Sequence, residues 1–288
     1  MKPAPFDYLR PGSLAEAAAA LAGEPNAKVL AGGQSLVPLL SMRIAAPSML
    51  VDINGLPDLS TIEVTGDGVR IGALARHAEV LAHVNAVRVQ PLLAMALSHV
   101  AHATIRNRGT TVGSIIHADA AAEMPAVLAL LGGSVEVESS SGRRTIPADE
   151  LFVGPLETSL RHDEIAVAAY FPALPPGAGV AFDEIARRHG DYAMCGVAAL
   201  IRVEGGAVVE ARTGYLSVND IPEVVDLTQL LAGGIDEESL AAAGEAALAQ
   251  LEPADDIHAT AVYRAQLVRV LTSRVVRSAH EDALRRSA

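Results

Sequence analysis

The sequence predicts a protein of mixed α and β structure that is divided into two domains. Helix-like segments alternate with short apolar segments through about the first 175 residues, as expected when helices cover a sheet. A run rich in proline and glycine at 172–179 interrupts this alternation. After it, two apolar stretches flank Gly205-Gly206 as in a β-hairpin, and the remainder has helical periodicity. We therefore expect an α/β arrangement in residues 1–175 and a smaller α+β arrangement in residues 176–288.

The individual elements follow from local signals. The capping pattern Ser13-Leu14-Ala15-Glu16 predicts a helix that continues to residue 22. Apolar runs bounded by glycine, proline or polar turns predict strands, at 27–30, 49–53, 69–73, 134–138, 144–146, 164–171, 197–203 and 207–218. Segments with helical spacing of apolar residues predict further helices, at 34–44, 91–102, 123–131, 236–251 and 260–286, and the start of another at 79–84.

Composition limits the classes of function. The formal net charge of −12 argues against a nucleic-acid partner, because phosphate neutralisation needs clustered lysine and arginine. Cys195 is the only cysteine, so this chain alone cannot form a disulfide, a four-thiolate iron–sulfur cluster or a four-cysteine zinc site. Its apolar stretches are shorter than the roughly 20 residues that span a bilayer. We expect a soluble, cytoplasmic protein.

Two glycine-bearing turns are the candidate functional features. The first, Ala31-Gly32-Gly33-Gln34-Ser35, follows Leu30 directly, and the second covers residues 106–114. Glycine lets consecutive backbone N–H groups converge on an anion, and two such turns could hold both phosphates of a dinucleotide. Each turn taken alone is also compatible with a plain connection between elements. No G-x-G-x-x-G pattern occurs in the chain, so a Rossmann domain is not expected.

Two other sets of polar residues have more than one interpretation. Glu123, about ten residues after the second turn, could accept hydrogen bonds from ribose hydroxyls. It could equally be an acid that the dipole favours in the first turn of a helix. His99 and His102 have helical spacing but no third ligand nearby. They are expected to be structural or exposed histidines, and no metal site or catalytic residue is assigned to the chain.

Five motifs together resemble the FAD-binding medium subunit of the molybdenum hydroxylases, the group of carbon monoxide dehydrogenase, xanthine dehydrogenase and hydroxybenzoyl-CoA reductase. That family opens with F-x-Y-x-R-P and continues with A-G-G-[HQT]-[SD], I-R-N-x-G-T-[IV]-G-G-[NS], [DE]-[LM]-P-A and G-D-[YF]-A. The matching segments here begin at Phe6, Ala31, Ile105, Glu123 and Gly190. Their order and spacing fit, so the resemblance covers essentially the whole chain.

The resemblance implies an α+β fold with a two-subdomain FAD-binding domain, non-Rossmann and similar to vanillyl-alcohol oxidase (the PCMH type). Its subdomains would span about 1–57 and 58–175, and a C-terminal domain of the carbon monoxide dehydrogenase type would span 176–288. It further implies an oxidoreductase subunit that passes electrons through FAD to an external acceptor. The molybdenum cofactor would lie in a large partner subunit and the [2Fe-2S] clusters in a small one, in a dimer of heterotrimers.

By the same resemblance, the first turn and Thr110 to Ser114 would bind the FAD pyrophosphate from two sides. Glu123 would bind sugar hydroxyls, Ile165 would lie near the adenine end, Ala101 would line the pocket and Tyr192 would sit at the isoalloxazine ring. The residues assigned to FAD binding are Leu30, Ala31, Gly32, Gly33, Gln34, Ser35, Leu36, Ala101, Thr110, Thr111, Val112, Gly113, Ser114, Glu123, Ile165 and Tyr192.

Val112 departs from the family, which has two adjacent glycines at this point. A β-branched side chain disfavours positive φ, so valine predicts either a backbone in the β region or weaker retention of FAD. In the second case, Val112→Gly would tighten retention. Two other functions stay open: an autonomous flavin-dependent oxidase or reductase of the same fold, and a scaffold subunit that no longer binds flavin.

Overall fold

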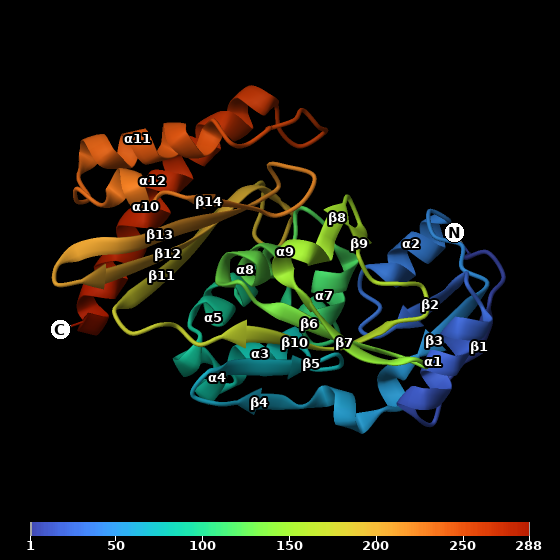
Figure 1. Ribbon diagram of the computed structural model, residues 1–288. Helices are drawn as coiled ribbons and strands as arrows, with labels where there is room; N and C mark the ends of the chain where they lie inside the picture. Colours follow the sequence, from blue (N-terminus) through green and yellow to red (C-terminus); the bar gives the residue numbers. More distant parts are fainter. Residues whose placement is uncertain (1, 288) are drawn as a thin grey trace.

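The computed structural model describes residues 2–287, and the chain begins with a small parallel sheet (Figure 1). The three strands lie in the order β1-β3-β2, and both pairings are parallel. Ser13 caps the first helix as predicted, because its hydroxyl accepts a hydrogen bond from the Glu16 N–H at 3.2 Å. The elements are β1 (Asp7–Leu9), α1 (Leu14–Gly23), β2 (Ala27–Leu30), α2 (Leu36–Met42) and β3 (Met49–Asp52).

A five-stranded antiparallel sheet follows, in the order β4-β5-β10-β6-β7. Its strands are β4 (Ile62–Val64), β5 (Gly68–Gly72), β6 (Ser134–Ser139), β7 (Gly142–Pro147) and β10 (Ile165–Pro172). Short helices fill the connections: α3 (His77–Ala82), α4 (Val84–Val89), α5 (Leu92–Leu97), α6 (Ala103–Arg106), α7 (Thr111–His117), α8 (Glu123–Leu131) and α9 (Ala148–Leu151). Two 3₁₀ turns, Ile53–Gly55 and Pro57–Ser60, and the β8–β9 pair (Phe152–Gly154 and Glu157–Thr158) complete this part. The expected subdomain limit near residue 57 falls between the two sheets and stays a prediction.

The prediction of a single helix at 91–102 is wrong. Helix α5 ends at Leu97, and Ala101 adopts a left-handed conformation with φ of 42° before α6 begins. The Arg106 guanidinium donates to the Val100 and Ala101 carbonyls at 2.8 and 2.9 Å. These bonds satisfy carbonyls that a continuous helix would have used, so the Arg106 side chain stabilises the break.

The second domain is a four-stranded antiparallel sheet, β11-β12-β13-β14, with three helices. The predicted hairpin is confirmed, because Gly205 and Gly206 take φ of 58° and 86° between β12 and β13. The elements are β11 (Ala178–Ala186), β12 (Ala193–Glu204), β13 (Ala207–Leu216), β14 (Glu223–Asp226), α10 (Thr228–Leu231), α11 (Glu237–Leu248) and α12 (Ala261–Ser287). Strand β11 is absent from the sequence prediction, which assigned no element there.

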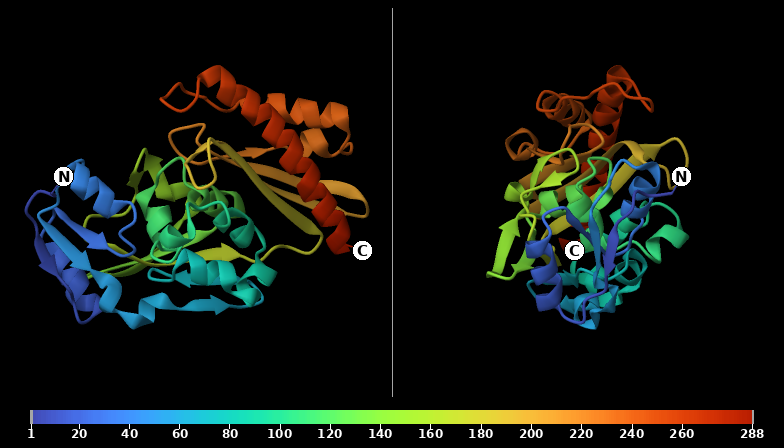
Figure 2. Two further views of the ribbon diagram at one scale, coloured as in Figure 1. Left: turned by 180° about the vertical axis from the view of Figure 1, so that it is seen from behind. Right: turned by 90° about the vertical axis from the view of Figure 1, so that its right-hand side faces the viewer.

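The four-stranded sheet is covered on both faces. Helix α12 packs on β11 and β12 from one side, whereas α5 and α8 of the first domain contact the other side (Figures 1 and 2). Along β12, Ala198 and Leu200 belong to the core of the first domain, and Val197 and Ala199 belong to the core under α12. This double burial explains why β12 is a nearly continuous apolar run.

The two ends of the described chain lie far apart, at opposite ends of the molecule (Figure 2). Within residues 2–287, no helix combines the length and apolar content that a membrane crossing requires.

Candidate functional site

The first glycine turn presents a row of free backbone donors. Gly33 takes a φ of +73°, the left-handed conformation that glycine permits. Within residues 2–287, the backbone N–H groups of Gly32, Gly33, Gln34 and Ser35 have no hydrogen-bond acceptor. The Gln34 side chain instead donates to the Gly32 carbonyl at 3.1 Å, which holds the turn in shape. Consecutive unpaired N–H groups of this kind form an anion-binding nest.

The second turn opens helix α7 rather than remaining a loop. Thr110 is the N-cap residue, and its hydroxyl accepts from the Gly113 N–H at 3.1 Å. A Cβ at Gly113 would lie 2.4 Å from that hydroxyl oxygen, so a larger residue there would force the Thr110 side chain to move. The buried Thr111 hydroxyl lies 3.3 Å from Nδ1 of His77. Burial, followed by the nearby Arg106, lowers the pKa of His77 to about 4.

The prediction for Val112 is wrong about the backbone conformation at this position. Val112 lies in the first turn of α7 and is not among the described residues with positive φ. Its side chain is 2% exposed and belongs to the core of the first domain. The backbone is therefore helical, not in the β region, and the valine needs no left-handed conformation. Whether FAD retention depends on this residue stays a prediction.

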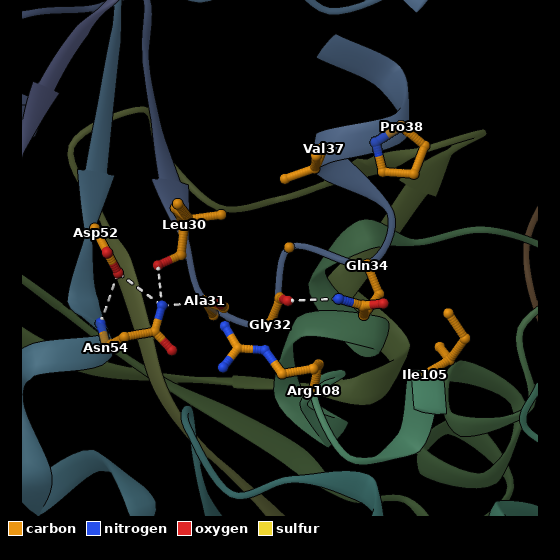
Figure 3. Close-up of a pocket in the computed structure, with 11 residues that line it drawn as sticks. Leu30, Ala31, Gly32, Gln34, Val37, Pro38, Asp52, Asn54, Ile105 and Arg108 are labelled. Carbon is orange, nitrogen blue, oxygen red and sulfur yellow. Dashed lines mark hydrogen bonds between the residues drawn. The ribbon is translucent and has the colours of Figure 1, made fainter. Parts of the chain in front are cut away.

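The two turns touch each other. A Cβ on Gly32 would lie 2.5 Å from the Arg108 carbonyl oxygen and 2.8 Å from the Gly109 Cα, so only glycine allows this approach. Beside the contact lies a pocket of about 400 Å³ (Figure 3). It is lined by Leu30, Ala31, Gly32, Gly33, Gln34, Val37, Pro38, Asp52, Asn54, Ile105 and Arg108.

Polar groups from several segments meet at the wall of this pocket. The Asn54 amide donates to the Ala31 carbonyl at 2.8 Å and to Asp52 Oδ1 at 2.6 Å. Although burial favours the protonated acid, hydrogen bonds from Tyr8 and Asn54 lower the Asp52 pKa below its ordinary value. In Figure 3 the Arg108 side chain points toward Ala31. Among residues 2–287 its guanidinium has no acceptor, although its backbone N–H donates to the Ile105 carbonyl at 3.0 Å and its carbonyl accepts from Arg76 at 2.7 Å.

A second group of polar residues lies at the N-terminus of α8. Burial, and next the Glu184 carboxylate, raise the pKa of Glu123 to about 8. Nδ1 of His99 lies 3.5 Å from Glu184 Oε1, and the hydrogen bond to this carboxylate raises the pKa of His99. The other Glu184 oxygen, Oε2, is buried and has no partner within the described chain. Tyr192 is exposed, and its pKa is raised by partial burial of the hydroxyl and then by Asp119 and Glu123.

The residues assigned to FAD from the sequence thus fall into two groups. One contains the two touching turns, and the other contains Glu123 and Tyr192, with helix α7 leading from the first toward the second. Ile165 is 1% exposed in β10 and is not among the residues that line the pocket, so its role in FAD binding stays a prediction. Sequence reasoning missed Val37, Pro38, Asp52, Asn54, Ile105 and Arg108 in the pocket wall, and His99 and Glu184 in the second group. Asn54 had a usable signal, since it closely follows a predicted strand beside the first turn.

Comparison with known proteins identifies the family. Residues 4–174 match the model of the "FAD binding domain in molybdopterin dehydrogenase". The chain belongs to this family. Residues 180–279 match the "CO dehydrogenase flavoprotein C-terminal domain". The family resemblance and the fold, an FAD-binding domain followed by a C-terminal domain, are therefore confirmed.

Relatives within the family resemble the chain along nearly its whole length. The 6-hydroxypseudooxynicotine dehydrogenase complex subunit alpha of Paenarthrobacter nicotinovorans is 41% identical, over 97% of this chain and 96% of the relative. The carbon monoxide dehydrogenase medium chain of Hydrogenophaga pseudoflava is 34% identical, over 97% and 98%. In the crystal structure of quinoline 2-oxidoreductase from Pseudomonas putida 86, a chain with 38% identity matches with a TM-score of 0.94, covering 99% of this chain and 100% of that one. These relatives are oxidoreductase subunits of multi-subunit complexes.

Proposed function

We propose that the chain binds FAD across the pocket between the two turns and serves as the electron-transfer subunit of a heteromeric molybdenum hydroxylase. The observation that carries the proposal is the row of unpaired N–H groups at Gly32–Ser35 beside the pocket. Diphosphate is the anion that such a nest, with the Arg108 guanidinium beside it, would stabilise. When bound, FAD would supply a centre that can take up electrons one at a time and hold two of them.

The second polar group fits the sugar and ring parts of the same molecule. A buried carboxylate oxygen without a donor, Glu184 Oε2, suits a ligand that brings hydroxyl groups. Glu123 lies close to Glu184, which supports the proposed contact with the sugar hydroxyls. The exposed ring of Tyr192 supports the proposal that it packs on the isoalloxazine and controls access to it. Ala101, Ser114, Leu36 and Ile165 keep the roles that the resemblance implies.

The other redox centres are assigned to partner subunits. Cys195 is fully buried on β12, and burial raises the pKa of its thiol to about 12, so it is a poor metal ligand. We assign the [2Fe-2S] clusters to a small subunit and the molybdenum cofactor to a large one. The proposed assembly is a dimer of heterotrimers in the cytoplasm, in which substrate is oxidised on the large subunit.

The test is direct titration of FAD into the full-length apo chain, followed by flavin fluorescence. Gly32→Ala places a methyl group against the Arg108 carbonyl and separates the turns, so Kd should rise at least about tenfold. Gly23→Ala is the matched control, because a Cβ at Gly23 has no atom within 4 Å. It should bind FAD like the wild type.

Three outcomes would overturn the proposal. A wild-type chain that fails to bind FAD, alone or in its purified complex, would favour a flavin-free scaffold. A chain that oxidises substrate without any partner subunit would favour an autonomous flavoenzyme. Equal Kd values for Gly32→Ala and wild type would show that FAD binds elsewhere on the chain.

A further inference from the structure

Arg76 connects the two turns without lining the pocket. It follows β5, in a segment that pairs with the second turn: the His77 N–H donates to the Gly109 carbonyl at 3.0 Å, and Arg76 lies opposite Thr110. These backbone contacts fix where the Arg76 side chain starts. The side chain is partly buried and is not among the residues that line the pocket.

The guanidinium of Arg76 bridges two acceptors that lie far apart in the sequence. Nη1 donates to the Arg108 carbonyl at 2.7 Å, and Nη2 donates to the Asn54 side-chain oxygen at 2.7 Å. Asn54 in turn donates to the Ala31 carbonyl at 2.8 Å. Arg76 and Asn54 therefore form a continuous hydrogen-bonded path from the first turn to the second.

This hydrogen-bonded path ends at the Arg108 carbonyl oxygen, which is also the atom that limits how closely the two turns approach each other. The Arg108 carbonyl oxygen accepts from Arg76 and also packs against Gly32, where no side chain fits. Asn54 is itself oriented by Asp52, whose second oxygen accepts from the Tyr8 hydroxyl. Each member of the path is thus held by a further bond, so the spacing of the turns is fixed by Asn54 in the pocket wall and by Arg76 outside the lining.

We propose that Arg76 and Asn54 are positioning residues that set the separation of the two turns and thereby the affinity for FAD. The inference rests on the proposed function, since it concerns the same pocket. Arginine is required because its planar fork reaches both acceptors at once, whereas a lysine ammonium on a flexible stem cannot reproduce this geometry. Arg76 acts through the backbone of the turns and touches no part of the ligand.

The test measures FAD Kd and apo-protein unfolding separately, on the full-length chain, for Arg76→Gln, Arg76→Lys, Asn54→Ala and the double variant Arg76→Gln/Asn54→Ala. Arg76→Gln and Asn54→Ala should each raise Kd about tenfold, and the double variant should be no weaker than about tenfold, because both interrupt one path. Arg76→Lys keeps the charge but should bind FAD nearly as weakly as Arg76→Gln.

Arg70→Gln is the matched control. Arg70 lies in β5 and makes two hydrogen bonds to Glu136, each of 2.8 Å, but it contacts neither turn. It should lower the unfolding midpoint of the apo chain and leave Kd within about twofold of wild type.

The inference is overturned if Arg76→Gln and Arg76→Lys, folded as judged by unfolding, bind FAD within about twofold of wild type. It is also overturned if the two substitutions are additive, so that the double variant loses about a hundredfold. Failure of the wild-type chain to bind FAD is a different result, because it removes the proposed function itself.

Discussion

At the scale of single residues, the site separates backbone recognition from side-chain chemistry. The first turn offers N–H groups, and the acidic side chains lie in the second group, at the N-terminus of α8. Glu123 is the residue whose protonation differs most from that of an ordinary glutamate there, because burial and Glu184 raise its pKa to about 8. At pH 7 it is therefore mainly protonated, which limits charge repulsion with Glu184.

This shift predicts the pH dependence of apo-protein stability. The folded chain holds the Glu123 proton more tightly than the unfolded chain, so stability should fall as pH rises from about 4.5 to about 8. Glu123→Gln should remove this loss and stabilise the chain at pH 8.5 by about 1 to 3 kcal/mol. Urea unfolding at pH 5.5 and pH 8.5 measures the difference.

Glu238→Gln is the control for this prediction, since Glu238 is an exposed acid in the first turn of α11. It should alter stability by less than about 1 kcal/mol at either pH. If Glu123→Gln and wild type lose stability in parallel between the two pH values, another group carries the dependence.

At the scale of elements, helix α7 changes the interpretation of the second turn. Sequence reasoning interpreted residues 106–114 as a loop, and the valine at 112 then looked unfavourable. In the structure Thr110 caps a helix, and Val112 fills the core beneath it. The same residue type is unfavourable in a left-handed turn and suitable in a buried helix.

Val112→Gly should therefore destabilise the chain and should not tighten FAD retention. Loss of a buried valine side chain and of helix propensity together cost about 2 to 3 kcal/mol. Thermal unfolding and FAD titration check the two parts. Val270→Gly, at an exposed position inside α12, isolates the helix-propensity term and should cost about 1 kcal/mol. Tighter FAD binding by Val112→Gly would restore the interpretation made from the sequence.

How far the sequence predicted the structure depended on the range of each interaction. The Ser13 cap and the Gly205-Gly206 hairpin arise from neighbouring residues, and these two predictions are confirmed. The break after Leu97 depends on side-chain bonds from Arg106 that helical periodicity does not reveal. The path through Arg76 depends on a side chain that reaches a distant backbone. Arg76 and Arg108 are 32 positions apart, and no local pattern indicates that they meet. Proximity of the two turns was expected from the family resemblance, whereas their direct contact was not.

At the scale of the whole molecule, the two domains share the four-stranded sheet as a common layer. Its inner face packs on α5 and α8, and its outer face packs on α12. At Gly179 on β11 the helix comes so close that an added Cβ would lie 2.1 Å from the Ala283 nitrogen. The position of α12 on the sheet therefore depends on this glycine.

Gly179→Ala should displace α12 and destabilise the full chain by about 3 kcal/mol, because backbone atoms cannot move aside as a flexible side chain would. Gly233→Ala, where a Cβ has no atom within 4 Å, should be nearly neutral. Differential scanning calorimetry compares the two. Equal melting temperatures would mean that the α12 contact adapts without cost.

The unpaired N–H groups of the first turn have a consequence for how this protein can change. Every amino acid except proline carries the same backbone donor, so most substitutions of Ser35 would leave the donors in place. At Gln34 a substitution keeps the backbone donor but loses the side-chain bond to the Gly32 carbonyl that holds the turn in shape. Redirecting the pocket toward a different cofactor would instead require a new loop length or a shift of the second turn. Cofactor choice is thus inherited with the fold, and engineering it calls for loop grafting instead of point mutation.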